Sequence, residues 1–274
     1  MDFKSIADTT RNYNFHSHTQ FCDGRTTMRE MACAAVRQGM EHYGFSPHSP
    51  IPIPSPCNMS RDDMAEYLAE ADRIKNDPEL AACRFYTALE VDYLGPEWGP
   101  AHPYFKELPL DYLIGSVHFI PSQSGEPVDI DGHFDSFRRR MKEFFRNDIE
   151  YVVETFYAQS RAMIEAGGFD ILGHFDKVSQ NANYYAPGIE DSEHYRQLVG
   201  KLVDFIVEKK LVVELNTKAR VEHGRFFPSE RYLPRLVREG VTIVVNSDAH
   251  HPDRILASRD EAFRILDSLA PCAQ

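Results

Sequence analysis

The sequence has few of the features that mark secreted, membrane or thiolate-bound proteins. It holds five cysteines, and no two are spaced as Cys-x-x-Cys, so neither a disulfide framework nor a thiolate zinc site is indicated. No apolar run approaches the roughly 18 residues of a membrane span. The N-terminal stretch MDFKSIADTTRNYNFH lacks the basic start and apolar core of a secretory signal. We therefore expect free thiols, no membrane partner and a cytoplasmic location.

Positively charged residues are also fewer than negatively charged ones. Lysine and arginine number 30 against 42 aspartate and glutamate residues, which gives a formal net charge of -12. A protein that binds nucleic-acid backbone normally presents a basic surface, so we expect no nucleic-acid partner. A small phosphorylated substrate stays possible, because bound cations can reverse the local field of an acidic protein.

Short apolar runs alternate with amphipathic stretches along the whole chain, which we interpret as one domain spanning residues 1–274. This alternation predicts an α/β protein with a mostly parallel sheet covered by helices, and it leaves open whether the sheet closes into a barrel. The expected strands lie at 13–15, 42–45, 85–91, 112–117, 169–172, 211–215 and 241–245. The expected helices start near 27 and span about 61–75, 134–146, 149–166, 192–209, 229–239 and 257–269.

Nearly every expected strand is followed by a side chain that can bind a metal ion. Parallel sheets carry their chemistry at the carboxyl ends of the strands, so these side chains should meet at one rim. One histidine after a strand is usually unremarkable, but five strand ends that carry histidine favour a metal site. Imidazole and carboxylate ligands without thiolates suit zinc, manganese or iron. The residues are His16, His18, Asp23, His48, Glu90, His118, His174, Asp248 and His250.

Two pairs in this set are spaced two residues apart. In extended backbone such residues point to the same side, so His16 and His18 can bind one ion together. Asp248 and His250 can likewise face one ion, or diverge to neighbouring ions if the backbone turns between them.

Seven motifs in this order resemble the PHP family (polymerase and histidinol phosphatase), and most closely its histidinol-phosphate phosphatase branch. The resemblance extends from about residue 13 to 251. The motifs are HSH at 16–18, CDG at 22–24, GFSPHSP at 44–50, ALEVDY around Glu90, GSVHF at 115–119, GHFDK at 173–177 and NSDAH at 246–250.

The resemblance implies a distorted (β/α)7 barrel with three divalent metal ions (zinc, manganese or iron). It implies that Glu90 bridges two of them. The first ion would be held by His16, His18, Glu90 and Asp248, the second by Glu90, His118 and His174, and the third by Asp23, His48 and His250. Where related sequences read Ser-Asp-His-Ser-Pro, this chain has Pro47 before His48, which removes a possible partner of a ligand at the third ion.

The activity implied is hydrolysis of L-histidinol phosphate to L-histidinol and phosphate. A water that bridges two ions would have its pKa lowered towards about 7 and act as the nucleophile. Asp248, with His250 beside it, is the candidate catalytic residue that supplies or orients the proton for the leaving alkoxide. Arg220 is the first candidate for binding the substrate phosphate and Lys177 the second, followed by Lys218 and Arg225.

Three alternatives remain open at this stage. The same fold could hydrolyse another phosphate ester such as a nucleotide, or it could be a structural domain that has lost its activity. A metal-dependent amidohydrolase also begins with His-x-His, but it would usually need a bridging lysine at a strand end. The remaining histidines are expected to be non-ligands, Tyr184 or Phe226 could wall the substrate pocket, and loop 95–107 around Trp98 could form part of a lid.

Overall fold

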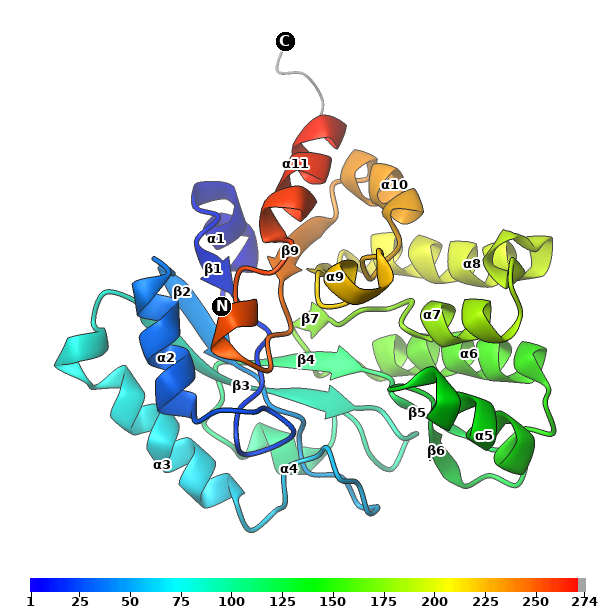
Figure 1. Ribbon diagram of the computed structural model, residues 1–274, viewed down its shortest axis with the longest axis horizontal. Coiled ribbons are helices and arrows are strands. Elements are labelled where there is room, and N and C mark those ends of the chain that lie inside the picture. The colour runs from blue at the N-terminus through cyan, green and yellow to red at the C-terminus, as the bar shows by residue number, and fades with distance from the viewer. Residues whose placement is uncertain (271–274) are drawn as a thin grey trace.

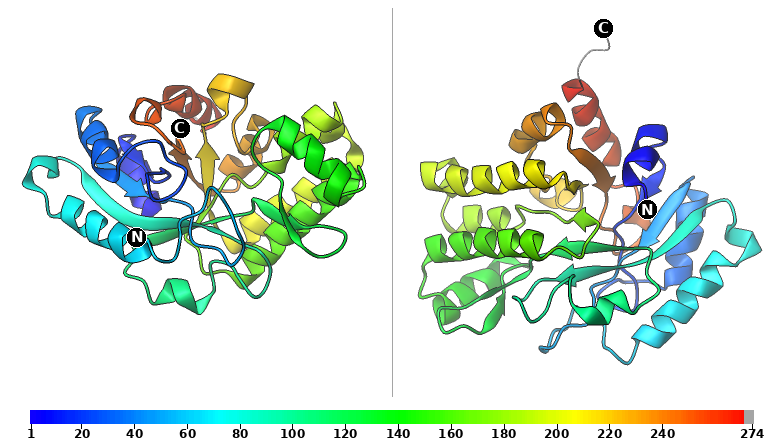
Figure 2. Two further views of the ribbon diagram at one scale, coloured as in Figure 1. Left: turned by 60° about the horizontal axis from the view of Figure 1, so that its bottom comes forward. Right: turned by 180° about the vertical axis from the view of Figure 1, so that it is seen from behind.

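A computed structural model describes residues 1–270, and its centre is a curved sheet of seven parallel strands in the order β1-β2-β3-β4-β7-β8-β9. Helices surround the outside of this sheet (Figures 1 and 2). The expected parallel sheet is confirmed, because a strand lies within each of the seven predicted runs or overlaps it. The strands are β1 Tyr13–Asn14, β2 His42–Phe45, β3 Arg84–Asp92, β4 Tyr112–Ser116, β7 Ile171–Leu172, β8 Val212–Asn216 and β9 Thr242–Asn246.

The two end strands, β1 and β9, meet and close the sheet into a distorted (β/α)7 barrel, as the resemblance implied. A parallel bridge joins Ser17 to Ala249, and the His18 N–H donates to the Ala249 carbonyl at 2.9 Å. Side chains make the rest of this seam. The Asn14 carboxamide oxygen accepts the Ser247 N–H at 2.8 Å, and the Asn246 oxygen accepts the Phe15 N–H at 2.8 Å.

Aromatic side chains fill the amino-terminal end of the barrel. Tyr13, Phe15 and Tyr112 belong to one buried cluster inside the sheet. Phe3, from helix α1 (Phe3–Thr9), meets Phe15 and Tyr112 edge to face, with ring centroids 5.1 and 5.3 Å away. Because α1 covers this end, the opposite end, where the strands terminate, is the one left for a site.

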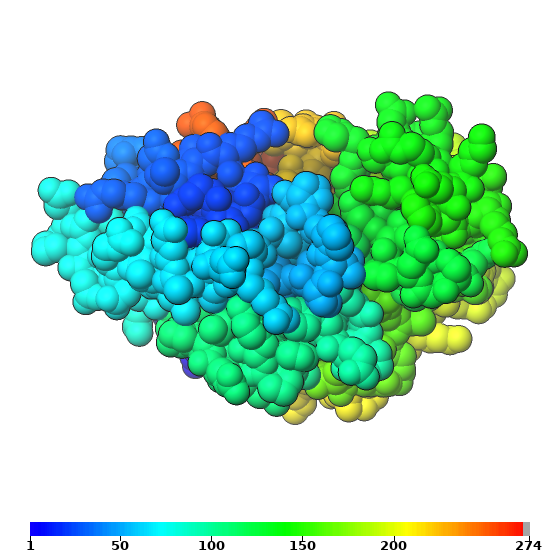
Figure 3. Space-filling model, turned by 90° about the horizontal axis from the view of Figure 1, so that it is seen from below, coloured from blue at the N-terminus to red at the C-terminus, as the bar shows by residue number. Residues whose placement is uncertain are grey.

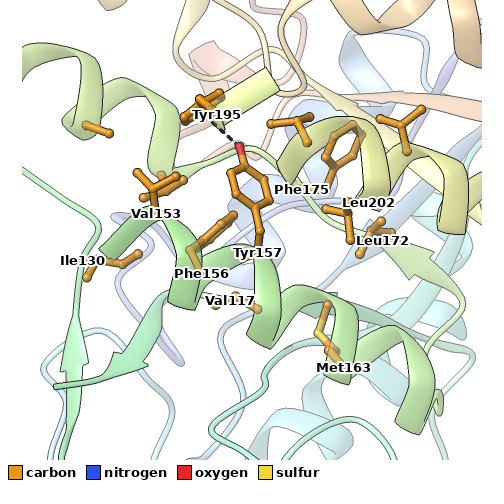
Figure 4. Close-up of a cluster of buried hydrophobic side chains, with 14 of the residues drawn as sticks. Val117, Ile130, Val153, Phe156, Tyr157, Met163, Leu172, Phe175, Tyr195 and Leu202 are labelled. Carbon is orange, nitrogen blue, oxygen red and sulfur yellow. Dashed lines mark hydrogen bonds between the residues drawn. The ribbon is translucent and has the colours of Figure 1, made fainter. Parts of the chain in front are cut away.

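Helix α6 (Ile149–Ala166) shows how the outer helices pack on the sheet. Its buried residues recur every three to four positions, as an amphipathic helix requires. Figure 4 shows Tyr157 of α6 among these side chains, where its hydroxyl bonds that of Tyr195 at 2.7 Å. Tyr195 lies on α8 (Glu193–Lys209), so this bond ties two neighbouring helices together inside their apolar contact.

Four of the other helices, at Met28–Arg37, Met64–Lys75, Phe134–Phe144 and Arg259–Leu269, match predicted ones, whereas those at Phe3–Thr9, Pro103–Lys106, Val178–Tyr185 and Arg220–His223 were not predicted. Thr27 caps the first of the predicted helices with Glu30 in a reciprocal capping box. The predicted helix at 229–239 is wrong in part, because a 3-10 turn (Glu230–Tyr232) precedes a short helix that has a proline in its first turn. The remaining helices are α2 Met28–Arg37, α3 Met64–Lys75, α4 Pro103–Lys106, α5 Phe134–Phe144, α7 Val178–Tyr185, α9 Arg220–His223, α10 Leu233–Arg238 and α11 Arg259–Leu269.

A small antiparallel hairpin follows β4, formed by β5 (Phe119–Pro121) and β6 (Pro127–Asp129). The sequence predicted only a loop here.

Four cysteines (Cys22, Cys33, Cys57 and Cys83) are free, and Cys272 lies outside the described residues. None of the helices in residues 1–270 combines the length and apolar character needed to cross a membrane.

Candidate metal centre

Glu90, near the end of β3, lies at the middle of a group of histidines. Its Oε2 atom is 3.2 Å from His16 Nε2 and 3.0 Å from His48 Nδ1. Its Oε1 atom is 2.9 Å from His174 Nε2 and 3.6 Å from His118 Nε2. Each of these histidines follows a different strand, so the barrel brings together side chains that are far apart in the sequence. The two oxygens of one carboxylate thus face two different pairs of imidazoles.

A second group lies where β1 and β9 meet. His18 Nε2 is 3.0 Å from Asp248 Oδ1, and His16 Nε2 is 3.9 Å from the same oxygen. Asp248 has a φ of 49°, in the left-handed region that a non-glycine residue rarely adopts. The backbone therefore turns at Asp248, and its carboxylate and the His250 imidazole stay neighbours, with Asp248 Oδ1 3.4 Å from His250 Nδ1.

His250 joins a third group around Asp23. Asp23 Oδ1 is 3.2 Å from His250 Nε2, 3.9 Å from His48 Nε2 and 3.5 Å from His18 Nδ1. Pro47 does not keep His48 out of this group, because the ring nitrogens of His48 face Glu90 on one side and Asp23 on the other.

All nine predicted ligand residues thus meet at one rim. Three sets have possible ligand atoms within 4.8 Å of one another: His16, His18 and Asp248; His48, Glu90 and His118; and His18, Asp23, His48 and His250. His174 is in none of these sets, although it contacts Glu90.

Neighbouring acceptors fix the orientation of three of these imidazoles. His16 Nδ1 lies 2.7 Å from Glu214 Oε1, His118 Nδ1 lies 2.8 Å from Asp92 Oδ1, and His250 Nδ1 lies 3.0 Å from the Asp248 carbonyl. A neutral imidazole that donates through Nδ1 keeps the Nε2 lone pair for a metal ion. In all three residues, Nε2 is the nitrogen that faces the centre.

Buried polar atoms at the centre test whether a metal ion fits. His16 Nε2, His18 Nε2, His48 Nδ1 and Asp23 Oδ1 are buried, and they have no hydrogen-bonding partner among the described residues. Buried polar atoms in proteins are almost always paired, and imidazole nitrogens and carboxylate oxygens are ligands of divalent cations. These residues therefore fit a divalent metal ion.

The charges of Glu90 and His250 agree with that fit. Burial would raise the pKa of Glu90, but His16, His48 and His118 outweigh burial and hold this pKa well below its usual range. Burial, together with His18 and Lys218, lowers the pKa of His250 to about 4. Glu90 is therefore ionised and His250 neutral near neutral pH, which are the forms that bind metal ions. Burial would lower the pKa of His16 and His118, but the carboxylates around them outweigh burial and raise these pKa values to about 10 and about 9, so a metal ion must displace a proton from each.

A cavity of about 720 Å³ opens onto the centre. Its floor includes Asp23, His48, Glu90, His118 and Asp248. Four parts of the chain form its walls: the segment 53–58, the hairpin β5–β6 together with α5, helix α7, and residues in and just before α9. In Figure 3 the light-blue segment around residues 50–60 lies beside the green segment that holds the hairpin and α5.

Only two of the four candidate phosphate-binding residues line this cavity. Lys177 and Lys218 line it, and Lys218 Nζ is 3.3 Å from Asp248 Oδ1 and 3.2 Å from His250 Nε2. The structure does not bring Arg220 to the cavity. Its guanidinium pairs with Glu261 and Glu230 instead, although its neighbours Ala219, Glu222 and His223 line the cavity. Arg225 also lies elsewhere, paired with Glu190.

Other expectations about the cavity walls are met only in part. Tyr184 lines the cavity, whereas Phe226 is buried in the core. Loop 95–107 does not line the cavity, and Trp98 is buried under Arg61, whose guanidinium is 5.0 Å from the ring centroid. The segment 53–58 covers the site instead.

Two carboxylates beside the centre were given no role from the sequence, although Glu214 was expected at the rim because it ends a strand. Asp92 accepts hydrogen bonds from both the ring and the main chain of His118, and Glu214 holds His16. A signal was available in each case, since Asp92 is two residues from Glu90, and Glu214 is near the end of a strand that otherwise lacked a ligand.

Comparison with known proteins agrees with this geometry. The model of the PHP domain family matches residues 14–218. The histidinol-phosphatase of Bacillus subtilis (strain 168) is 27% identical over 254 residues, covering 86% of this chain and 92% of the relative. A probable histidinol-phosphatase of Clostridium acetobutylicum is 23% identical over 164 residues, which is 58% of either chain.

Two solved structures share the fold. The putative histidinol phosphatase of Listeria monocytogenes superposes with a TM-score of 0.79 at 19% identity, covering 89% of this chain and 97% of the other. The histidinol phosphate phosphatase of Lactococcus lactis, complexed with zinc, L-histidinol and phosphate, gives a TM-score of 0.66 at 16% identity, covering 94% and 93%. The region matched by the family model, residues 14–218, includes seven of the nine ligand candidates, and Asp248 and His250 follow it. The barrel, the histidine-rich rim and the family match agree, and the chain belongs to the PHP domain family.

Proposed function

We propose that the protein is a metal-dependent phosphatase that hydrolyses L-histidinol phosphate to L-histidinol and phosphate. The observation that carries this proposal is the convergence of six histidines and three carboxylates at one rim of the barrel, with Glu90 at their centre and five of the nine lining one cavity. The substrate is chosen from the relatives, since the Bacillus subtilis protein is a histidinol-phosphatase and the Lactococcus lactis structure holds L-histidinol and phosphate.

Three divalent ions, zinc, manganese or iron, are proposed for the site. His16, His18 and Asp248 would hold one, His118 and His174 another with Glu90 between the two, and Asp23, His48 and His250 the third. Three such ions bring a formal charge of about +6 against roughly -3 from the carboxylates. The excess would attract a phosphate dianion into an otherwise acidic protein.

When bound, such ions lower the pKa of coordinated water towards about 7 and offset the charge that builds up on the phosphoryl group. The residues of the chain have separate tasks. Glu214 and Asp92 orient His16 and His118, and Lys218 and Lys177 bind the phosphoryl oxygens from the side of the cavity. Asp248, with His250 beside it, orients a water molecule that protonates the leaving alkoxide.

Steady-state assays with a panel of phosphate esters test the proposal. L-Histidinol phosphate should be hydrolysed with a kcat/KM well above that of p-nitrophenyl phosphate and of nucleoside monophosphates. Chelation should abolish the activity, and zinc, manganese or iron should restore it. A substrate preference for nucleotides would move the protein to another phosphoesterase activity, and activity that survives chelation would contradict the metal mechanism.

A further inference from the structure

An ion pair faces the cavity beside the metal centre. Lys177 Nζ is 3.4 Å from Asp131 Oδ2, and both residues line the cavity. Both are also fixed close to proposed ligands. The Lys177 N–H donates to the His174 carbonyl at 2.8 Å, and the N–H of Ile130, next to Asp131, donates to the His118 carbonyl at 2.9 Å. The pair therefore occupies a defined position next to the centre.

The Lys177 ammonium is well placed for a phosphate group. Its side chain is 13% exposed and lies over the Phe227 ring, with Nζ 5.0 Å from the centroid, so it is directed inward. Its contact with Asp131 is long for a charge-assisted hydrogen bond, which is usually about 2.7–2.9 Å. A phosphoryl oxygen can therefore compete with this carboxylate for the Lys177 ammonium.

Asp131 differs from the other carboxylates of the cavity wall. Asp129 is held by Arg140 at 2.7 Å and accepts the Asp131 N–H at 2.8 Å, while Glu126 and Glu222 are exposed. The Asp131 side chain keeps 33% of its surface exposed. Burial would raise its pKa, but Lys177, His118 and Lys218 outweigh burial and hold this pKa below its usual range. Asp131 thus offers a negative charge to the cavity.

Once Lys177 turns to a phosphate, Asp131 is left beside the centre with its charge unpaired. Leaving it so would be costly, and an ammonium group on the substrate would restore the pair. We propose that Asp131 is a specificity-determining residue that binds a primary ammonium group close to the phosphate ester, so that the substrate exchanges its own two charges for the Lys177–Asp131 pair. This inference rests on the proposed function and identifies the residue that recognises the amine of the substrate.

The rest of the cavity suits an aromatic or heteroaromatic group attached to that amine. Phe134 and Tyr184 line it and meet edge to face, with centroids 5.6 Å apart. The Tyr184 hydroxyl lies 3.1 Å from His223 Nδ1, another residue of the lining. A substrate anchored by phosphate and ammonium could place a ring against these side chains.

The test compares two substrates in three proteins: L-histidinol phosphate and the same ester without its amino group, with wild type, Asp131→Asn and Asp135→Asn. Asp135 is a matched control because it lies four residues further on, is 87% exposed in its side chain and does not line the cavity. Wild type and Asp135→Asn should prefer the amine by about 10- to 100-fold in kcat/KM, the range expected for a hydrogen bond to a charged group. Asp131→Asn should lose this preference, mainly through a higher KM for the amine.

Two results would overturn the inference. One is an Asp131→Asn protein that keeps the preference for the amine. The other is an equal loss with both substrates, which would assign Asp131 to the support of His118. A measurement without any variant is inhibition of wild-type p-nitrophenyl phosphate hydrolysis by L-histidinol and by the alcohol that lacks the amine. Equal inhibition by the two also contradicts the inference.

Failure of the proposed function would be recognised separately. If wild type hydrolyses L-histidinol phosphate no better than p-nitrophenyl phosphate, the substrate assignment fails. Asp131 can then be judged with 2-aminoethyl phosphate against ethyl phosphate. A preference for the aminated ester that disappears in Asp131→Asn supports the ammonium site, and no preference in wild type refutes it.

Discussion

At the scale of single residues, the site depends on how each imidazole is held as well as on which ligands are present. His16, His118 and His250 each lie with Nδ1 next to an oxygen acceptor of the protein and with Nε2 directed to the centre. His174 lacks such a described partner for Nδ1, and its Nε2 lies 2.9 Å from Glu90. As a proposed metal ligand, His174 therefore acts through Nε2, the ring nitrogen that faces Glu90.

Replacement of His174 by alanine should remove one metal ion and most of the activity. The side chain is buried and its Nε2 faces Glu90, so alanine would leave this oxygen of Glu90 without its imidazole neighbour. The loss in kcat should exceed the roughly 10- to 100-fold that the loss of an outer partner of a ligand costs. Metal analysis of the purified variant and its steady-state kinetics measure this.

His42→Ala is the matched control, because His42 lies at the start of β2 and bonds the Tyr86 hydroxyl at 2.7 Å, at the other end of the sheet. Its metal content should equal that of wild type. A His174→Ala protein with the full complement of metal would exclude His174 as a ligand.

The sequence was a good guide to the nine residues at the rim and a poor one to their supports. Strand ends in a parallel sheet converge, so a histidine or carboxylate after a short apolar run already has a predictable position. Glu214 supports a histidine 198 residues away, and this relation is fixed only when the barrel closes. Arg220 was placed wrongly in the cavity because its partner Glu261 lies 41 residues away, and the sequence does not show that this carboxylate holds the guanidinium.

At the scale of elements, the side chain of Asn58 connects the segment 53–58 to the surroundings of the metal centre. Asn58 Nδ2 donates to the Ser49 carbonyl at 2.9 Å and to Asp92 Oδ2 at 3.3 Å. The other oxygen of Asp92 accepts from His118. The segment that covers the cavity is thereby connected to a proposed metal ligand.

Asn58→Ala should loosen both the covering segment and Asp92. We expect kcat/KM for L-histidinol phosphate to fall by about 10-fold, the lower end for residues that support a ligand. Stopped assays at fixed metal concentration measure the change. Asn76→Ala is the control, since Asn76 is exposed and bonds only Asp72 among the described residues. Full activity in Asn58→Ala would show that the covering segment is held by other contacts.

Elements with strong periodicity were predicted and those without it were missed. The long helices α6 and α8 show their buried positions in the sequence. The hairpin β5–β6 was interpreted as a loop, because its strands have three residues each and contain Pro121 and Pro127. Contacts with α6 hold it in place, for instance the Tyr151 hydroxyl that donates to the Pro121 carbonyl at 3.0 Å, and the pattern of a short segment does not reveal such contacts.

At the scale of the whole molecule, the barrel is closed by side chains as well as by main chain. Arg259 is fully buried between β1 and β9, and its guanidinium donates to the carbonyls of Tyr13, Val245 and Arg11. Burial lowers its pKa to about 10, so it stays charged at neutral pH. The guanidinium thus holds the seam together from within.

Arg259→Met should keep much of the packing volume but leave these carbonyls without their donor. Each buried acceptor that loses its partner costs about 1–3 kcal/mol, so we expect a loss of at least about 3 kcal/mol in the free energy of unfolding. Chemical denaturation followed by circular dichroism measures this. Arg264→Met on the exposed face of α11 should change stability by less than about 0.5 kcal/mol. Equal stability of the two variants would show that the guanidinium is not needed at the seam.

The seam between β1 and β9 differs from the rest of the barrel in its sensitivity to mutation. Within β3–β4 or β8–β9, the ladder is made of peptide groups and is the same whichever side chains are present. Between β1 and β9, much of the joint consists of the carboxamides of Asn14 and Asn246 and the guanidinium of Arg259. His16, His18, Asp248 and His250 directly follow these two strands, so a point mutation at the joint can scatter ligands that it never touches.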